Sequence, residues 1–223
     1  MYLLPWQGDT VKKKIAVIGD VILDEYISGD VLRISPEAPV PVHKVTGQHY
    51  SAGGAANTAR NIQKIGGQAY LFGVWANDKD ELEKILLTEE IDCSGMVVVS
   101  DRPTIKKTRV VSQHHQMLRL DWEKIHPLTK EAEEKIFTVL SAHKFDAIVL
   151  SDYGKGTLSV DLTKKIIDFA RKKNIPTVVD PKRTDFSVYC GCSLITPNRK
   201  EALLALGCSE DNPSALAQNL VEK

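Results

Sequence analysis

Aspartates end three short apolar stretches of the sequence, and lysines follow two of them. The stretches are KIAVIGD (14–20), DAIVLSD (146–152) and PTVVD (176–180), which end in Asp20, Asp152 and Asp180. Asp24 follows the first aspartate, and Lys155 and Lys182 come within three residues of the other two. Carboxylates accept hydrogen bonds from hydroxyls, and ammonium groups pair with phosphate. The pattern predicts a ligand with hydroxyls and a phosphate, although any one strand-final Asp is also an ordinary turn former or helix cap.

The elements that position these residues are strands and helices in alternation. The three stretches are β-branched and nearly continuously apolar, which is typical of parallel strands buried on both faces. Amphipathic helices are expected at 128–143 and 159–174. An α/β domain with a doubly wound or three-layer sheet follows from this alternation. The aspartates then converge, because ligands bind at the carboxyl ends of such strands.

Two further segments have two interpretations each. SAGGAANTARNIQKIGG (51–67) begins a helix with Gly53, Gly54 and Asn57, which would offer backbone N–H groups and an amide to a hydroxylated ligand. Tight packing of helix on sheet explains the small residues equally well. In TPNRKEALLALG (196–207), Asn198 and Glu201 have the spacing of a capping box, and they could equally support a magnesium-nucleotide site.

Segments 24–50 and 95–122 alternate polar and apolar residues, as half-exposed antiparallel strands do. They predict a small second sheet over the first. Near the end of the chain, Asn212 and Pro213 indicate a helix start, with Leu216, Leu220 and Val221 as an apolar stripe awaiting a further strand.

Composition excludes several partners. The 223 residues carry 29 basic and 29 acidic side chains, so no global field favours nucleic acid or an anionic membrane. No stretch approaches the roughly 20 apolar residues of a membrane span, and the N-terminus lacks the pattern of a secretory signal. A cytosolic protein is expected. The four cysteines, which include no CxxC pair, are expected to be free thiols.

Seven motifs carry a resemblance to a known family. In chain order they are IAVIGDVILDEY, RISPEAPVPV, GGAANTARNI, QMLRLDWE, LSDYGKG, DPKRTDF and TPNRKEA. Together they resemble the heptose-7-phosphate kinase domain of the bifunctional ADP-heptose synthase, within the ribokinase (PfkB) family. The resemblance covers residues 14–223, with 1–13 as an N-terminal extension. It implies a ribokinase-like three-layer α/β domain with a mostly parallel sheet, whose small β lid also serves homodimerisation.

The resemblance also implies an activity, ATP-dependent phosphorylation of the anomeric hydroxyl of D-glycero-β-D-manno-heptose 7-phosphate, towards ADP-heptose for lipopolysaccharide. Asp24, Gly53, Gly54 and Asn57 would hold sugar hydroxyls. Arg119, Lys155 and Lys182 would surround the sugar phosphate. Asn198 and Glu201 match the family motif that organises Mg²⁺ and the phosphates of ATP.

The sequence departs from the family pattern in one respect. The Gly-Ala-Gly-Asp segment, which supplies the family's general base and anion hole, lies beyond the TPN motif and does not occur in these residues. The chain alone is therefore expected to be inactive, with its C-terminal part missing or supplied by a separate chain. The alternatives are a non-catalytic sugar-phosphate-binding or regulatory protein, and a fragment of another PfkB sugar kinase.

Overall fold

The structure is a computed structural model that describes residues 12–113, 115–209 and 212–222. Six strands form the main sheet in the order β10-β9-β8-β1-β4-β5, and all of its pairs are parallel. They are β1 (Lys14–Gly19), β4 (Gln68–Trp75), β5 (Asp92–Val98), β8 (Ala147–Ser151), β9 (Thr177–Asp180) and β10 (Leu194–Ile195). The three predicted buried strands are confirmed as β1, β8 and β9.

Helices cover both faces of the main sheet, which explains why β1 is apolar throughout. Ala16 and Ile18 of β1 belong to the core under α3 and α4, whereas Val17 faces the core under α1 and α2. The helices are α1 (Ala55–Lys64), α2 (Asp80–Thr88), α3 (Lys130–Ala142), α4 (Val160–Lys172), the 3-10 helix η1 (Phe186–Tyr189), α5 (Arg199–Leu206) and α6 (Pro213–Glu222). The predicted α/β architecture, with helices on both faces of a parallel sheet, is confirmed.

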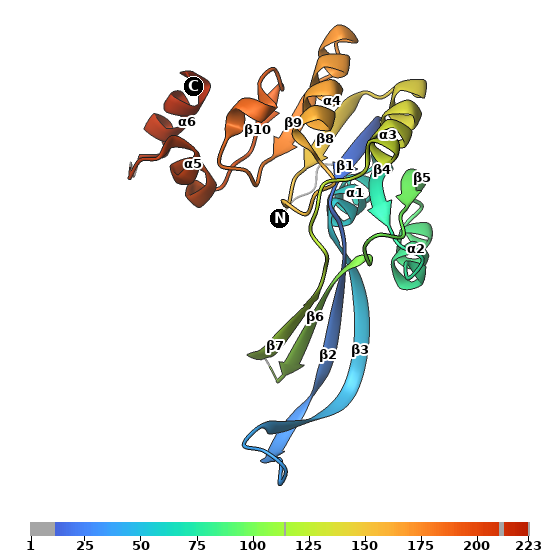
Figure 1. Cartoon of the computed structure of the whole chain (residues 1–223), viewed down its shortest axis with the longest axis vertical. Coiled ribbons are helices and arrows are strands. Elements are labelled where there is room, and N and C mark those ends of the chain that lie inside the picture. Colours follow the sequence, from blue (N-terminus) through green and yellow to red (C-terminus); the bar gives the residue numbers. More distant parts are fainter. Residues whose placement is uncertain (1–11, 114, 210–211, 223) are drawn as a thin grey trace.

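A second sheet, called the lid below, extends from one end of the main sheet (Figure 1). Its order is β3-β2-β6-β7, with β2 (Val21–Ile34), β3 (Pro41–Gly54), β6 (Ile105–Ser112) and β7 (His115–Trp122). Only Asp20 separates β1 from β2, and β3 runs directly into α1. The lid therefore leaves and re-enters the main domain at the carboxyl end of β1.

Two expectations for the lid need correction. Its pairs β2–β3 and β6–β7 are antiparallel as expected, but β2 and β6 pair in parallel. Residues 95–98 belong to β5 of the main sheet rather than to the lid. Because β5 is the edge strand of that sheet, its residues are partly exposed in an irregular pattern that resembles a half-exposed lid strand.

The last helix starts as predicted but is better covered than expected. The backbone N–H of Ser214 donates to Oδ1 of Asn212 at 2.9 Å, which fixes the start of α6. Leu216 is only 4% exposed, because α6 packs against α5 (Figure 1). The expectation that Leu216 awaits a further strand was therefore wrong. The side chain of Val221 lies outside the described residues.

In the described part of the chain, no helix is long and apolar enough to cross a bilayer. All four cysteines are free thiols, as expected, with Cys190 and Cys208 exposed and the other two partly buried.

Candidate active site

The carboxyl ends of β1, β8 and β9 meet at one edge of the main sheet. Parallel pairing places Gly19 beside Ser151 and Ser151 beside Asp180. The backbone N–H of Asp20 donates to the carbonyl of Ser151 at 3.2 Å, and that of Asp152 donates to the carbonyl of Asp180 at 3.0 Å. The structure thus brings the three strand-final aspartates together, but it gives them different roles.

Asp20 organises a loop and does not face a ligand. Its carboxylate accepts backbone hydrogen bonds from Tyr153 at 2.9 Å, Lys155 at 2.9 Å and Thr157 at 3.0 Å. The residue is 0% exposed. The prediction that Asp20 binds substrate hydroxyls is therefore wrong. Its charge is instead compensated by backbone donors, which hold the loop after β8 in place.

Asp152 has a similar structural role. Its carboxylate accepts from the backbone of Gly154 at 2.8 Å, Nε of Arg183 at 3.0 Å and the hydroxyl of Tyr189 at 2.7 Å. Only 3% of the residue is exposed, so its predicted contact with substrate is also wrong. Burial and the Asp152 charge together raise the pKa of Tyr189, which keeps its phenol protonated and donating.

Asp180 differs from the other two because its carboxylate is open. The side chain is half-buried, and it has no hydrogen-bond donor among the described residues. Burial raises the pKa of Asp180, the nearby Glu201 charge raises it further, and Lys182 opposes both. Lys182 itself pairs with Glu201 at 3.4 Å. Asp180 and Glu201 therefore form an acidic pair with one neighbouring ammonium.

Asn198 and Glu201 form the capping box of α5. Oδ1 of Asn198 accepts from the backbone of Glu201 at 3.0 Å, and Oε2 of Glu201 accepts from the backbone of Asn198 at 3.0 Å. This confirms the structural interpretation and leaves Oε1 of Glu201 facing Lys182. The described residues contain no group of three His, Cys, Asp or Glu that could enclose a metal. Asp180 and Glu201 nevertheless fit Mg²⁺, which commonly binds one or two carboxylates together with water and phosphate oxygens.

Asp24 lies near the start of lid strand β2, four residues after Asp20, and its charge acts on Tyr153 together with those of Asp180 and Glu201. Nη1 of Arg109 pairs with Oδ1 of Asp24 at 2.5 Å, and the guanidinium carbon of Arg109 lies 5.2 Å from the centre of the Tyr26 ring. Gly53 makes room for the carboxylate, since a Cβ there would lie 2.3 Å from Oδ2 of Asp24. Asp24 is thus fixed from two sides while remaining partly exposed.

The start of α1 explains the second glycine. Gly54 has a φ of +55°, and a Cβ would lie 2.3 Å from the carbonyl oxygen of Asp20. That carbonyl accepts from the backbone of Ala55 at 2.9 Å, so the helix begins directly against β1. No side chain caps α1, and Asn57 is exposed in its first turn. The start of α1 is therefore packed closely against β1, and its first backbone N–H groups have no side-chain cap.

A chain of ion pairs links the lid to the loop after β8. Lys155 pairs with Glu123 at 2.7 Å, Glu123 approaches Lys107 at 3.9 Å, and Lys107 pairs with Asp121 at 3.1 Å. Arg119 pairs with Asp121 at 2.8 Å. Hydrogen bonding from Arg119, together with the charge of Lys107, lowers the pKa of Asp121. The structure therefore brings the predicted residues Arg119 and Lys155 into one network, whereas Lys182 lies with Glu201.

Arg102 holds the same loop from the lid side. Its guanidinium is buried and donates to the carbonyl of Lys155 at 3.3 Å and to the carbonyl of His126 at 2.6 Å. Gly156 passes so close to His126 that a Cβ would lie 2.1 Å from its carbonyl oxygen. Lys155 is therefore positioned through both its backbone N–H and its carbonyl.

Sequence reasoning missed Arg109, Lys107 and Tyr153. Burial raises the pKa of Tyr153, and the charges of Asp180, Asp24 and Glu201 raise it further, so the tyrosine is near carboxylates of both the lid and the main sheet. Tyr153 directly follows Asp152 in the sequence, and that position was a usable signal. Lys107 and Arg109 alternate along β6, but only the register with β7 shows that they face Asp121 and Arg119.

Comparison with known proteins gives a family and relatives. The model of the pfkB family carbohydrate kinases matches residues 12–223. The bifunctional protein HldE of Gluconobacter oxydans is 44% identical over 199 residues, which cover 87% of this chain and 42% of that protein. HldE of Pasteurella multocida is 40% identical over 222 residues, or 98% of this chain and 46% of the relative. The chain spans less than half the length of these relatives.

Solved structures share the fold at low sequence identity. A tetrameric inhibited form of phosphofructokinase-2 from Escherichia coli has a TM-score of 0.73 at 18% identity, covering 96% of this chain and 69% of that one. Ribokinase from Arabidopsis thaliana, complexed with ribose and ATP, has a TM-score of 0.66 at 14% identity, covering 95% and 68%.

Proposed function

Because the chain belongs to the pfkB family of carbohydrate kinases, we propose that it serves the ATP-dependent phosphorylation of D-glycero-β-D-manno-heptose 7-phosphate at the anomeric hydroxyl. The product would lead towards ADP-heptose for lipopolysaccharide. Support comes from the 40–44% identity to proteins named HldE and from the motifs that resemble heptose-7-phosphate kinases.

One structural observation carries this proposal, namely the polar lid face opposite the sheet edge. Asp24 and Arg109 share it with Lys107 and Arg119, because side chains at paired positions on neighbouring strands point to the same face. Carboxylate acceptors beside fixed cations suit a ligand with several hydroxyls and a phosphate. A ligand held between lid and sheet would meet both.

We assign the sugar hydroxyls to Asp24, Asn57 and the backbone around Gly53 and Gly54. The sugar phosphate is assigned to Arg119, Lys155, Lys107 and Arg109, of which the last two were not anticipated. Lys182 is moved from the sugar phosphate to the nucleotide phosphates, because it pairs with Glu201.

ATP and Mg²⁺ complete the proposed site. Asp180 and Glu201 would hold the metal together with nucleotide oxygens, next to Asn198 at the start of α5. When bound, Mg²⁺ neutralises charge on the phosphates. The residues of this chain bind and orient both substrates, and no described residue is assigned as the general base. We propose a cytoplasmic location as well, because the proposed reaction uses ATP.

Binding of the sugar phosphate tests the proposal without requiring turnover. We expect calorimetry with D-glycero-D-manno-heptose 7-phosphate to show saturable binding that Asp24→Asn weakens about tenfold, or about 1.4 kcal/mol. Asp30→Asn is the matched control, since Asp30 is an exposed carboxylate on the same strand. Equal affinity of all three proteins would remove Asp24 from the site. No binding by the unmodified chain would contradict the proposed substrate.

We also propose that the lid forms a homodimer. Leu118, Leu120 and Trp122 are 53%, 40% and 54% exposed, and alternation along β7 puts them on the lid face opposite Arg119. An exposed apolar patch of this kind marks an interaction surface. Analytical ultracentrifugation should show a dimer that Leu118→Lys dissociates, with Leu204→Lys on exposed α5 as the control. A monomer at all concentrations would refute it.

A further inference from the structure

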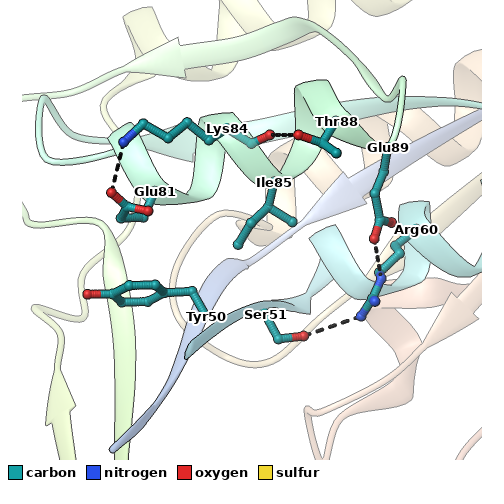
Figure 2. A pocket seen from close by; sticks show the side chains of 8 residues that line it. All are labelled: Tyr50, Ser51, Arg60, Glu81, Lys84, Ile85, Thr88 and Glu89. Atoms are coloured by element: carbon teal, nitrogen blue, oxygen red, sulfur yellow. Dashed lines mark hydrogen bonds and ion pairs between the residues drawn. The ribbon is translucent and has the colours of Figure 1, made fainter. Parts of the chain in front are cut away.

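A shallow hollow that is open to solvent lies at the base of the lid, on the side that carries α2, and contains none of the candidate active-site residues. It has a volume of about 300 Å³, within the range of small-molecule sites. It is called the α2 cavity below. Its lining residues are Tyr50 and Ser51 of β3, Arg60 of α1, Glu81, Lys84, Ile85 and Thr88 of α2, and Glu89 (Figure 2).

Ion pairs join polar groups on two walls of the α2 cavity, a partly buried pair on one wall and an exposed pair on the other. Nε of Arg60 donates to Oε1 of Glu89 at 2.7 Å, and its Nη1 donates to the hydroxyl of Ser51 at 3.3 Å. Lys84 pairs with Glu81 at 2.9 Å on the other wall (Figure 2). Two cations thus face two carboxylates. A ligand with a net charge would gain from one partner and lose to the other, so the walls favour a neutral ligand.

The cations and the carboxylates that line the α2 cavity can each make further hydrogen bonds. An arginine has five N–H donors and a lysine ammonium has three, which the contacts above only partly use. Carboxylate oxygens accept more than one hydrogen bond each, so Glu81 can accept more than the one from Lys84. Hydroxyls are groups that both donate and accept. A molecule with several hydroxyls can therefore satisfy ammonium, guanidinium and carboxylate together.

An apolar surface lies between the two ion pairs. Figure 2 shows Ile85 pointing from α2 towards β3, with the Tyr50 ring beside it. Burial raises the pKa of Tyr50, and the charges of Glu25 and Glu81 raise it further, so the phenol stays uncharged. The C–H face of a small ring could pack on these two side chains. We therefore propose that the α2 cavity binds a small, neutral, ring-shaped polyol, as a site separate from the active site.

A ligand in the α2 cavity would affect the active site through β3, the strand against which Asp24 packs. Ser51 pairs in register with Asp24, and Gly53, two residues further, leaves room for the Asp24 carboxylate. A ligand that bridges Ser51 and α2 would hold the strand against which Asp24 packs. We expect this ligand to strengthen substrate binding. A lid that is already rigid loses less conformational entropy when the substrate binds. This coupling rests on the proposed function, whereas binding to the cavity does not.

Binding can be tested with myo-inositol, a neutral six-membered ring of hydroxyls that lacks phosphate and an anomeric centre. We expect a titration of the ¹⁵N-labelled full chain to shift the amide signals of Tyr50, Ser51 and Ile85 saturably, with a Kd of about 10 mM or tighter. Arg60→Gln should weaken binding at least about tenfold. Lys64→Gln is the matched control, since Lys64 also approaches Glu89 at 3.8 Å but does not line the cavity.

A second variant guards against a folding defect in Arg60→Gln. Ile85→Phe fills the cavity and leaves both ion pairs in place, so it should abolish the shifts without disturbing the remaining spectrum. Several results would overturn the proposal. They are no saturable shift, shifts centred on Asp24 and Asn57, unchanged binding in both variants, and tighter binding of glycine betaine or inorganic phosphate to the same amides.

Coupling is tested by calorimetry with heptose 7-phosphate, with and without saturating myo-inositol. We expect at least about a fivefold gain in affinity, the lower end of typical allosteric coupling. The gain should vanish in Ile85→Phe and persist in Lys64→Gln. An unchanged affinity would overturn the coupling. If heptose 7-phosphate binds in neither condition, the proposed function is wrong. The myo-inositol titration still tests whether the α2 cavity binds a polyol.

Discussion

The carboxylates near the sheet edge differ in how many hydrogen bonds they accept from the rest of the protein. Asp20 and Asp152 are nearly inaccessible, and each accepts three hydrogen bonds from the protein. Asp180 has no such donor in the described part of the chain, and Asp24 pairs with a single arginine and stays partly exposed. A buried, satisfied carboxylate stabilises a loop, whereas an exposed one keeps lone pairs for a ligand. Of the four carboxylates, Asp24 and Asp180 therefore keep the most capacity for a ligand, which fits the sugar and metal roles proposed for them.

Gly53→Ala should damage the site more than the fold. The added Cβ would lie 2.3 Å from Oδ2 of Asp24, so the carboxylate must move away from its place beside Arg109. We expect affinity for heptose 7-phosphate, measured by calorimetry, to fall about tenfold or more. Gly47→Ala on the same strand is the control, because a Cβ there meets nothing within 4 Å. An unaltered affinity in Gly53→Ala would show that the position of Asp24 does not matter.

Tyr189→Phe should destabilise the chain. The hydroxyl of Tyr189 donates to buried Asp152 at 2.7 Å, and a hydrogen bond to a charged group contributes about 1.5–3 kcal/mol. Urea unfolding should show a loss of that size. Tyr153→Phe is the matched control, because the Tyr153 hydroxyl has no hydrogen-bond partner among the described residues and should leave the midpoint unchanged. Equal midpoints for both variants would contradict the assigned role of Asp152.

At the scale of elements, the base of the lid contains a buried polar network. Glu25 of β2 accepts from Gln48 of β3 at 2.5 Å and from the hydroxyl of Thr108 on β6, and it pairs with Lys106 at 3.5 Å. One carboxylate thus joins three strands. Burial alone would raise the pKa of Glu25, but the hydrogen bonds from Thr108 and Gln48 and the charge of Lys106 outweigh burial and lower it.

The lid should therefore weaken in acid. A folded pKa below the unfolded value of about 4.3 means that Glu25 contributes fully above that pH and loses its contribution as the pH falls through the folded pKa. Melting temperatures measured between pH 6 and pH 3 should fall less in Glu25→Gln than in the unmodified chain. The expected difference is about 2–4 °C for each 1 kcal/mol. Glu37→Gln, at an exposed lid position, should follow the unmodified chain.

Local sequence patterns predicted three of the six strands of the main sheet, β1, β8 and β9, but not β4 or β10, and they assigned part of β5 to the lid. Strands such as β1 and β8 are covered on both faces, so their apolar runs are distinctive, and capping residues such as Ser159 mark helix starts directly. The parallel pairing of β2 with β6 could not be predicted, because register between distant strands leaves no local pattern. The burial of Asp20 and Asp152 was missed for a related reason. Their partners are backbone donors and side chains from other segments.

At the scale of the whole molecule, the main sheet and the lid differ in how they are supported. Both large core clusters lie against the main sheet. The far end of the lid is exposed, with Leu32 at 83% and Ile34 at 61% exposure, and residues 35–40 form the connection between β2 and β3. Cutting that connection removes no core packing. The main domain should therefore survive a break at the lid tip.

Limited trypsin digestion of dilute protein tests this difference. We expect early cleavage after Arg33, which is exposed near the end of β2 beside the 35–40 connection, while the main domain stays folded by circular dichroism, because nicking concentrates at and next to loop tips. The Arg33→Gln variant should lose this first product in mass spectrometry. Early cleavage within α3 or α4 instead would show that the main domain is the less stable part.

The parallel pairing of β2 with β6 also constrains the order in which the chain folds. Glu25 and Thr108 bond to each other although they are 83 positions apart. Closing a loop of that length carries an entropic cost before any contact repays it. During synthesis, β2 and β3 can form a hairpin early, but that hairpin must wait for α1, β4, α2 and β5 to emerge and compact before β6 arrives. A nascent chain therefore presents one unpaired edge of β2 while the ribosome translates the roughly fifty codons between Gly54, the end of β3, and Ile105, the start of β6.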